Sequence, residues 1–128
     1  MNPISENLVK GTLGELLVQA RLLCYGVQAA PPLKDSGNDL IAVRHDQFRA
    51  IQVKTTQGPS YDLPEPDRLY HILAAVQLVG EGDYVDFEKS KIYLISYSEL
   101  DGLSRQFSKI QKWEINQALV DFLFQKEE

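Results

Sequence analysis

Two short runs of β-favouring residues, separated by three polar positions, constrain the fold of this chain more than any other feature. The runs span residues 39–44 and 48–54, are rich in Ile, Val and Phe, and flank His45-Asp46-Gln47. This pattern predicts two antiparallel strands joined by a tight turn. Side chains two apart on a strand point to the same face, so polar side chains at alternate positions of the second run lie together.

The length of the turn decides where Asp39 lies relative to the pair Gln52 and Lys54. A loop with an even number of residues, such as Asp46-Gln47, sets Asp39 opposite Lys54 and on its face. A three-residue loop turns Asp39 to the other face, because a slip of one residue inverts every side chain. If these side chains act together, we expect an even loop.

An amphipathic helix precedes the two strands. Ser5 suits its N-cap, and Gly26 suits the position just after its C-terminus. Gly11 and Gly14 lie inside it, where each costs roughly 1 kcal/mol relative to alanine. We therefore expect a backbone or a nucleic acid to approach closely there. The predicted apolar stripe recurs at steps of three and four: Leu8, Val9, Leu13, Leu16, Leu17, Ala20, Leu23 and Cys24.

The second half of the chain predicts a loop, further strands and a last helix. The Pro- and Gly-rich residues 55–66 form the loop. Residues 71–79 suit either a helix or a buried strand, whereas residues 91–97 favour a strand. A short helical turn at residues 98–100 follows, and Asn116 can cap a C-terminal helix. The apolar residues of that helix are Leu119, Val120, Phe122, Leu123 and Phe124.

Three short stretches, taken together and in order, are similar to the motifs of the PD-(D/E)XK nuclease superfamily: Glu15 on the helix, Gly37-Asn38-Asp39 and Gln52-Val53-Lys54. In that superfamily a helix carries a glutamate, a Gly-x-Asp opens the second strand, and the third strand carries (D/E)-x-K. The resemblance covers roughly residues 8–97. The departure is Gln52, where most members have a carboxylate, although glutamine still offers a carbonyl oxygen to a hard cation.

The resemblance implies an α/β fold with a restriction-endonuclease-like core. It implies a central mixed sheet of about five strands flanked by an N-terminal and a C-terminal helix, and it favours a strand for residues 71–79. One nuclease-like domain would span residues 1–128.

The resemblance also implies a catalytic set of Glu15, Asp39, Gln52 and Lys54. Mg²⁺, or Mn²⁺ in its place, would be held by Asp39, Gln52 and the backbone carbonyl of Val53, with Glu15 acting through water. Lys54 would orient the attacking water and offset the charge that develops on phosphorus. The implied reaction is the hydrolysis of DNA phosphodiester bonds.

The charge of the chain is uneven. Its net charge is −5, but residues 1–60 hold six Lys/Arg against five Asp/Glu, whereas residues 61–128 hold seven against thirteen. The proposed site therefore lies in the less acidic half, where cations can reach phosphates. The candidates for nucleic-acid contact are Lys10, Lys34, Arg44, Arg49 and Thr56, with Tyr61, Arg68 and Tyr70 from the adjoining loop.

Three features of the sequence bear on the cellular compartment of the protein. No apolar run reaches the roughly 18 residues of a membrane span, and the N-terminus lacks the pattern of a signal peptide. The single cysteine, Cys24, excludes an internal disulfide and is expected to be packed and inert on the helix stripe. We expect a cytoplasmic protein with no membrane partner.

Two alternatives and an assembly state complete the predictions. The first alternative is a binding module that keeps the nuclease fold without catalysis, and the second is a structure-selective resolvase or repair-type nuclease. A double-strand break requires two sites, so we expect a homo-oligomer. Phe122 and Phe124 cannot both face the same side of a helix, so one of them is available to a second copy.

Overall fold

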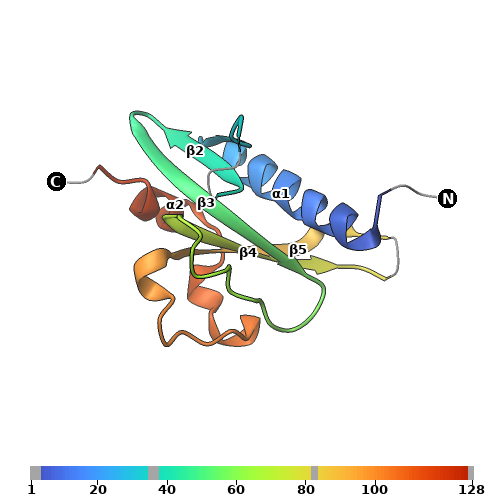
Figure 1. Cartoon of the computed structure of the whole chain (residues 1–128). Helices are drawn as coiled ribbons and strands as arrows, with labels where there is room; N and C mark the ends of the chain where they lie inside the picture. The colour runs from blue at the N-terminus through green and yellow to red at the C-terminus, as the bar shows by residue number, and fades with distance from the viewer. Residues whose placement is uncertain (1–3, 35–37, 82–83, 127–128) are drawn as a thin grey trace.

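The computed structural model describes residues 4–34, 38–81 and 84–126. A 19-residue helix, α1 (Glu6–Cys24), leads into a five-stranded sheet, and a short helix, α2 (Gln117–Leu123), closes the chain (Figure 1). The strands are β1 (Gln28–Ala30), β2 (Leu40–Arg44), β3 (Gln47–Thr56), β4 (Ile72–Val79) and β5 (Asp86–Ser96). Three 3₁₀ turns lie between β5 and α2: η1 (Tyr97–Glu99), η2 (Phe107–Lys109) and η3 (Gln111–Trp113). The predicted α/β architecture is confirmed.

Helix α1 begins and ends where the sequence predicts. The Ser5 hydroxyl accepts a hydrogen bond from the Leu8 backbone N–H at 3.2 Å, and Gly26 has φ +82° just after the last turn. The buried stripe is narrower than predicted, and Cys24 is exposed rather than packed. The reason is its angular position: Cys24 lies two residues after the fully buried Leu22, and hence on the other side of the helix. The buried residues of α1 are Gly14, Leu17, Val18 and Leu22.

The sheet is mixed and follows chain order, β1-β2-β3-β4-β5. Only the β3–β4 pair is parallel. The strand predicted at residues 71–79 is confirmed as β4, and five consecutive residues of it are buried because both of its faces are covered. Strand β1 has only three residues and was not predicted.

The β2–β3 hairpin has the even loop that the site requires. Arg44 pairs with Gln47, so the loop consists of the two residues His45 and Asp46, and His45 adopts φ 55°. The turn therefore lies one residue earlier than the predicted Asp46-Gln47 loop. The ladder runs to Leu40 opposite Ile51. If this ladder continued by one residue, Asp39 would lie opposite Gln52 instead of opposite Lys54, the predicted partner.

Both helices cover the same face of the sheet. A Cβ added to Gly14 of α1 would overlap the side chain of Thr55, so Thr55 faces α1. Arg49 lies on the same side of β3 by alternation, and its guanidinium donates to the Leu123 carbonyl oxygen of α2 at 3.0 Å. On the opposite face, the Tyr93 ring of β5 stacks on Phe107 with centroids 5.0 Å apart. The C-terminal segment therefore contacts both faces of the sheet. It does not cover the edge of β3 that lies beside α1.

No helix within residues 4–34, 38–81 and 84–126 is long and apolar enough to cross a membrane.

Candidate functional site

A cavity of about 570 Å³ lies beside the second half of β3. It exists because β2 pairs with β3 only as far as Ile51, so no described strand covers residues 53–56 on that side. The N-terminal half of α1 lies across this gap. The cavity is lined from α1 by Asn7, Lys10, Gly11 and Glu15, and from the strands and the following loop by Asp39, Val53, Lys54, Thr55, Thr56, Gln57 and Gly58.

Asp39 caps the point at which the two strands separate. Its backbone N–H donates to the Ile51 carbonyl oxygen at 3.0 Å, and its Oδ2 accepts from the Val53 backbone N–H at 2.8 Å. The N–H and C=O of one strand residue point to the same side of the strand. The Val53 carbonyl oxygen is therefore directed toward the same open edge as the Asp39 carboxylate.

Glu15 brings a second carboxylate to the cavity from α1. Its pKa is raised, first by burial and second by the negative charge of Asp39. A divalent cation bound beside the Glu15 carboxylate would offset this unfavourable negative charge. Gly14 allows this approach, because any Cβ there would overlap Thr55, whereas a Cβ on Gly11 would meet nothing within 4 Å.

Gln52 and Lys54 differ in their placement. Lys54 is half-buried, lines the cavity and forms no salt bridge within the described part of the chain. Gln52 is 7% exposed and is not among the lining residues. Its buried Oε1 has no hydrogen-bond partner. A buried oxygen without a partner costs about 1–3 kcal/mol, a cost that a bound water or cation would remove.

The structure thus brings Glu15, Asp39 and Lys54 together at one cavity, with Gln52 buried in the adjoining strand. No cluster of three or more His, Cys, Asp or Glu occurs among the described residues. The candidate donors predicted from the motif are the Glu15 and Asp39 carboxylates and the Val53 carbonyl at the cavity, with the Gln52 amide oxygen buried in the adjoining strand. All are oxygen donors, which suit Mg²⁺, an ion that keeps several of its own waters. Gly37 of the predicted motif lies outside the described residues.

Three of the candidate nucleic-acid contacts remain accessible. Lys10 lines the cavity and pairs with Glu6 at 3.0 Å, and its side chain is 28% exposed. Thr56 also lines it, and its hydroxyl accepts from the Gly58 backbone N–H at 3.0 Å. Lys34 is exposed and lies five residues before Asp39 in the chain.

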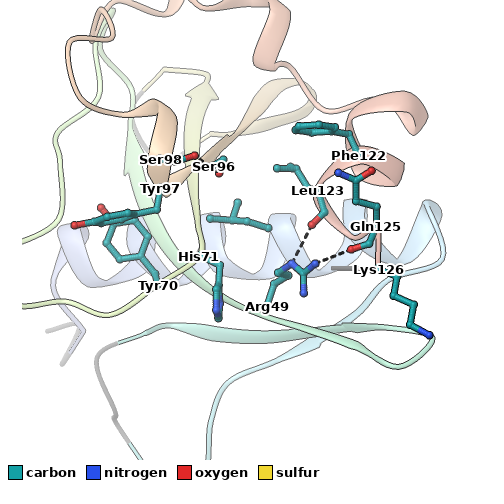
Figure 2. Close-up of a pocket in the computed structure, with 11 residues that line it drawn as sticks. Arg49, Tyr70, His71, Ser96, Tyr97, Ser98, Phe122, Leu123, Gln125 and Lys126 are labelled. Atoms are coloured by element: carbon teal, nitrogen blue, oxygen red, sulfur yellow. Dashed lines mark hydrogen bonds between the residues drawn. The ribbon is translucent and has the colours of Figure 1, made fainter. Parts of the chain in front are cut away.

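The other two cations have structural roles, which corrects the prediction of phosphate contact. Arg49 is 8% exposed, donates to the carbonyl oxygens of Leu123 and Gln125, and lies over the Phe124 ring (Figure 2). Arg44 pairs with Asp121 at 2.7 Å. Both arginines fasten α2 to the β2–β3 hairpin, a contact that sequence spacing could not show.

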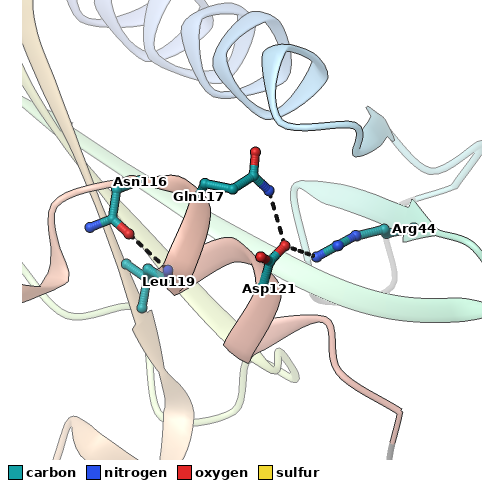
Figure 3. Close-up of polar contacts among 5 residues, drawn as sticks. All are labelled: Arg44, Asn116, Gln117, Leu119 and Asp121. Atoms are coloured by element: carbon teal, nitrogen blue, oxygen red, sulfur yellow. Dashed lines mark hydrogen bonds and ion pairs between the residues drawn. The ribbon is translucent and has the colours of Figure 1, made fainter.

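The Arg44 contact belongs to a small polar network at the surface (Figure 3). Gln117 donates to Asp121 at 3.0 Å, and this hydrogen bond, followed by the contact with Arg44, lowers the pKa of the Asp121 carboxyl. Asn116 caps α2 as predicted, accepting from the Leu119 backbone N–H at 2.8 Å. Tyr61 is also removed from the DNA-contact candidates, because it is 2% exposed and its hydroxyl donates to the Ser104 carbonyl oxygen.

Comparison with known proteins identifies the fold. No family model matches the chain, and no curated protein matches its sequence. Among solved structures, the chain is similar to a bacterial homing endonuclease, I-Ssp6803I, with a TM-score of 0.60 and 18% sequence identity over 94% of this chain and 92% of that chain. The chain therefore has an endonuclease-like α/β fold, with an N-terminal helix, a five-stranded mixed sheet and a short C-terminal helix.

Proposed function

We propose that this protein is a Mg²⁺-dependent endonuclease that hydrolyses DNA phosphodiester bonds. The observation that carries the proposal is the cavity at which Glu15, Asp39 and Lys54 meet, beside the edge of β3 that β2 leaves unpaired beyond Ile51. Their order in the chain matches the PD-(D/E)XK pattern, with Gln52 in place of an acid. The endonuclease-like fold supports the same assignment.

The donors of the cavity define how the cation would be held. Asp39, the Val53 carbonyl and the otherwise unpartnered Gln52 Oε1 would be its ligands, and Glu15 would act through water. Mn²⁺ has the same ligand preference and would substitute. When bound, the ion polarises the phosphate and lowers the pKa of an attacking water.

The side chains of the chain itself orient the reaction. The Val53 N–H donates to Oδ2 of Asp39 at 2.8 Å and so fixes the orientation of the carboxylate. The other carboxylate oxygen is directed elsewhere. Lys54 is the cation of β3 at the cavity, and its ammonium would neutralise the charge that develops on the phosphate and align the attacking water. Lys10 and Thr56 would contact neighbouring phosphates.

The decisive experiment is incubation with plasmid, linear and branched DNA in Mg²⁺ or Mn²⁺. Lys54→Ala and Asp39→Asn should abolish cleavage with an unchanged fold, because Asn keeps an acceptor for the Val53 N–H. Lys89→Ala is the matched control, since this exposed lysine lies on β5, away from the cavity. If the variants cut as fast as the wild type, the proposed site is wrong.

Two other outcomes would assign a different function. DNA binding without cleavage, together with an absence of divalent-cation binding, would favour a binding module that has lost catalysis. Selective cleavage of branched over linear DNA would favour a resolvase or repair-type nuclease. The substrate series therefore distinguishes all three readings in one assay.

The proposed activity also requires an assembly. One site cuts one strand, so a double-strand break needs a second copy of the chain. Phe122 of α2 is 56% exposed while Phe124 is 4% exposed, which leaves Phe122 available at the surface. We propose a dimer or larger homo-oligomer that light scattering would detect.

A further inference from the structure

A second recess, of about 470 Å³, adjoins the candidate site. Asn38 and Ala50 line it: Asn38 lies just before Asp39 in the segment that leads into β2, and Ala50 lies on β3, two residues before Gln52. Consecutive Cα atoms are about 3.8 Å apart, so the recess begins within one residue of Asp39, which lines the candidate site. A nucleotide next to a phosphate held at Asp39 would therefore reach this recess.

His71 occupies the recess in a fixed orientation. Its Nδ1 accepts a hydrogen bond from the Ala50 backbone N–H at 2.8 Å, and its own backbone N–H donates to the Ala50 carbonyl oxygen at 2.8 Å. An accepting Nδ1 carries no proton, so the proton of the neutral imidazole is on Nε2. The ring is exposed and offers this N–H donor away from β3, beside Tyr70 in Figure 2.

The neighbouring wall is aromatic. Tyr70 and Tyr97 meet edge to face with ring centroids 5.2 Å apart, and both rings line the recess. Burial, followed by the nearby Tyr97, raises the pKa of Tyr70, so its hydroxyl stays neutral. Arg68 adds a positive charge at the same recess. An aromatic ring face combined with one oriented donor matches a nucleobase, which presents a π-face and acceptor atoms on its edge.

We propose that this recess reads a base of the DNA next to the scissile phosphate, with the His71 Nε2–H donating to a base acceptor and Tyr70 contacting the base itself. The inference rests on the proposed nuclease function and adds a specificity-determining residue to it. His71 makes two separable contributions: Nδ1 holds β3, and Nε2–H contacts the base.

The test separates these contributions with His71→Asn. The Asn side-chain oxygen can replace Nδ1 as acceptor for the Ala50 N–H, but nothing replaces the Nε2–H donor. Wild type and variant are presented with a library of duplexes randomised around the cut, and both cleaved ends in Mg²⁺ and bound duplexes in Ca²⁺ are sequenced. His45→Asn, the same replacement at the exposed hairpin turn, is the control. Thermal unfolding shows whether the fold is retained.

We expect His71→Asn to unfold at the wild-type temperature, to remain active, and to lose about tenfold discrimination at one base position beside the cut. An unchanged preference would overturn the inference alone. A uniform loss of affinity for every sequence would also overturn it, because that result indicates a phosphate contact. A wild-type protein that neither cuts nor binds DNA would overturn the proposed function together with the inference.

Discussion

Replacement of Gln52 by glutamate is the sharpest test of the metal site. The side chain is 7% exposed and its Oε1 lacks a partner. Gln52→Glu buries a carboxylate in β3, between the two residues, Ile51 and Val53, whose backbone groups hydrogen-bond to Asp39. Without a cation, we expect this to lower the free energy of unfolding by about 1–3 kcal/mol at pH 8. At about 4 °C per kcal/mol for a chain of this size, the melting temperature should fall by roughly 4–12 °C.

A divalent cation should reverse that loss. Binding to the folded state alone stabilises by about 2.7 kcal/mol when the free ion is at 100 times its Kd, which corresponds to roughly 10 °C here. Acid should reverse it as well. Burial raises the folded-state pKa of the introduced carboxyl, so the destabilisation is present at high pH and disappears below the ordinary pKa of about 4.3.

The assay is thermal unfolding at pH 8 and pH 4, with and without 10 mM Mg²⁺ as an order-of-magnitude saturating concentration. Gln47→Glu, the same change at the half-buried start of β3, is the matched control and should show little dependence on Mg²⁺. Cleavage by Gln52→Glu at or above the wild-type rate would identify a ligand position. If Mg²⁺ restores no more stability to Gln52→Glu than to Gln47→Glu, position 52 does not contact the cation.

Three further predictions test the site and its surroundings. Glu15→Gln should stabilise the metal-free protein at pH 7.5 by less than about 1 kcal/mol, because the raised pKa of Glu15 makes its ionised form unfavourable in the fold. In unfolding scans this gain in stability should vanish below about pH 4.5, the ordinary pKa of the Glu15 carboxyl. A gain that persists at lower pH would contradict this reasoning. Gly14→Ala should destabilise by about 1–3 kcal/mol through overlap with Thr55, whereas Gly11→Ala should stabilise by roughly 0.5–1 kcal/mol; denaturant unfolding compares them, and equal effects would refute the close approach. Phe122→Ser should shift light scattering toward monomer without lowering the melting temperature of that monomer, and an unchanged mass would show that another surface holds the copies together.

The N-terminal ends of the two helices were predictable from the sequence because they depend on local chemistry. Ser5 and Asn116 cap the two helices, and their side-chain oxygens satisfy backbone N–H groups only three residues away. The two-residue loop at His45 and Asp46 likewise follows from the short polar spacing between two β-favouring runs. The placement of Asp39 and Lys54 at one cavity agrees with the parity argument, although the register differs by two residues.

Tertiary structure alone decided which charged residues are available for a ligand. In the sequence, Arg44, Arg49 and Lys10 are all cations of the less acidic half. Contacts with the C-terminal segment around α2, more than 70 residues along the chain, nevertheless hold both arginines in the fold. The ring tautomer of His71 depends in the same way on the Ala50 N–H of a neighbouring strand. A sequence shows periodicity and spacing within an element, but a side chain's burial and partners depend on which distant segments pack against it, and that free energy is gained only when the whole chain has folded.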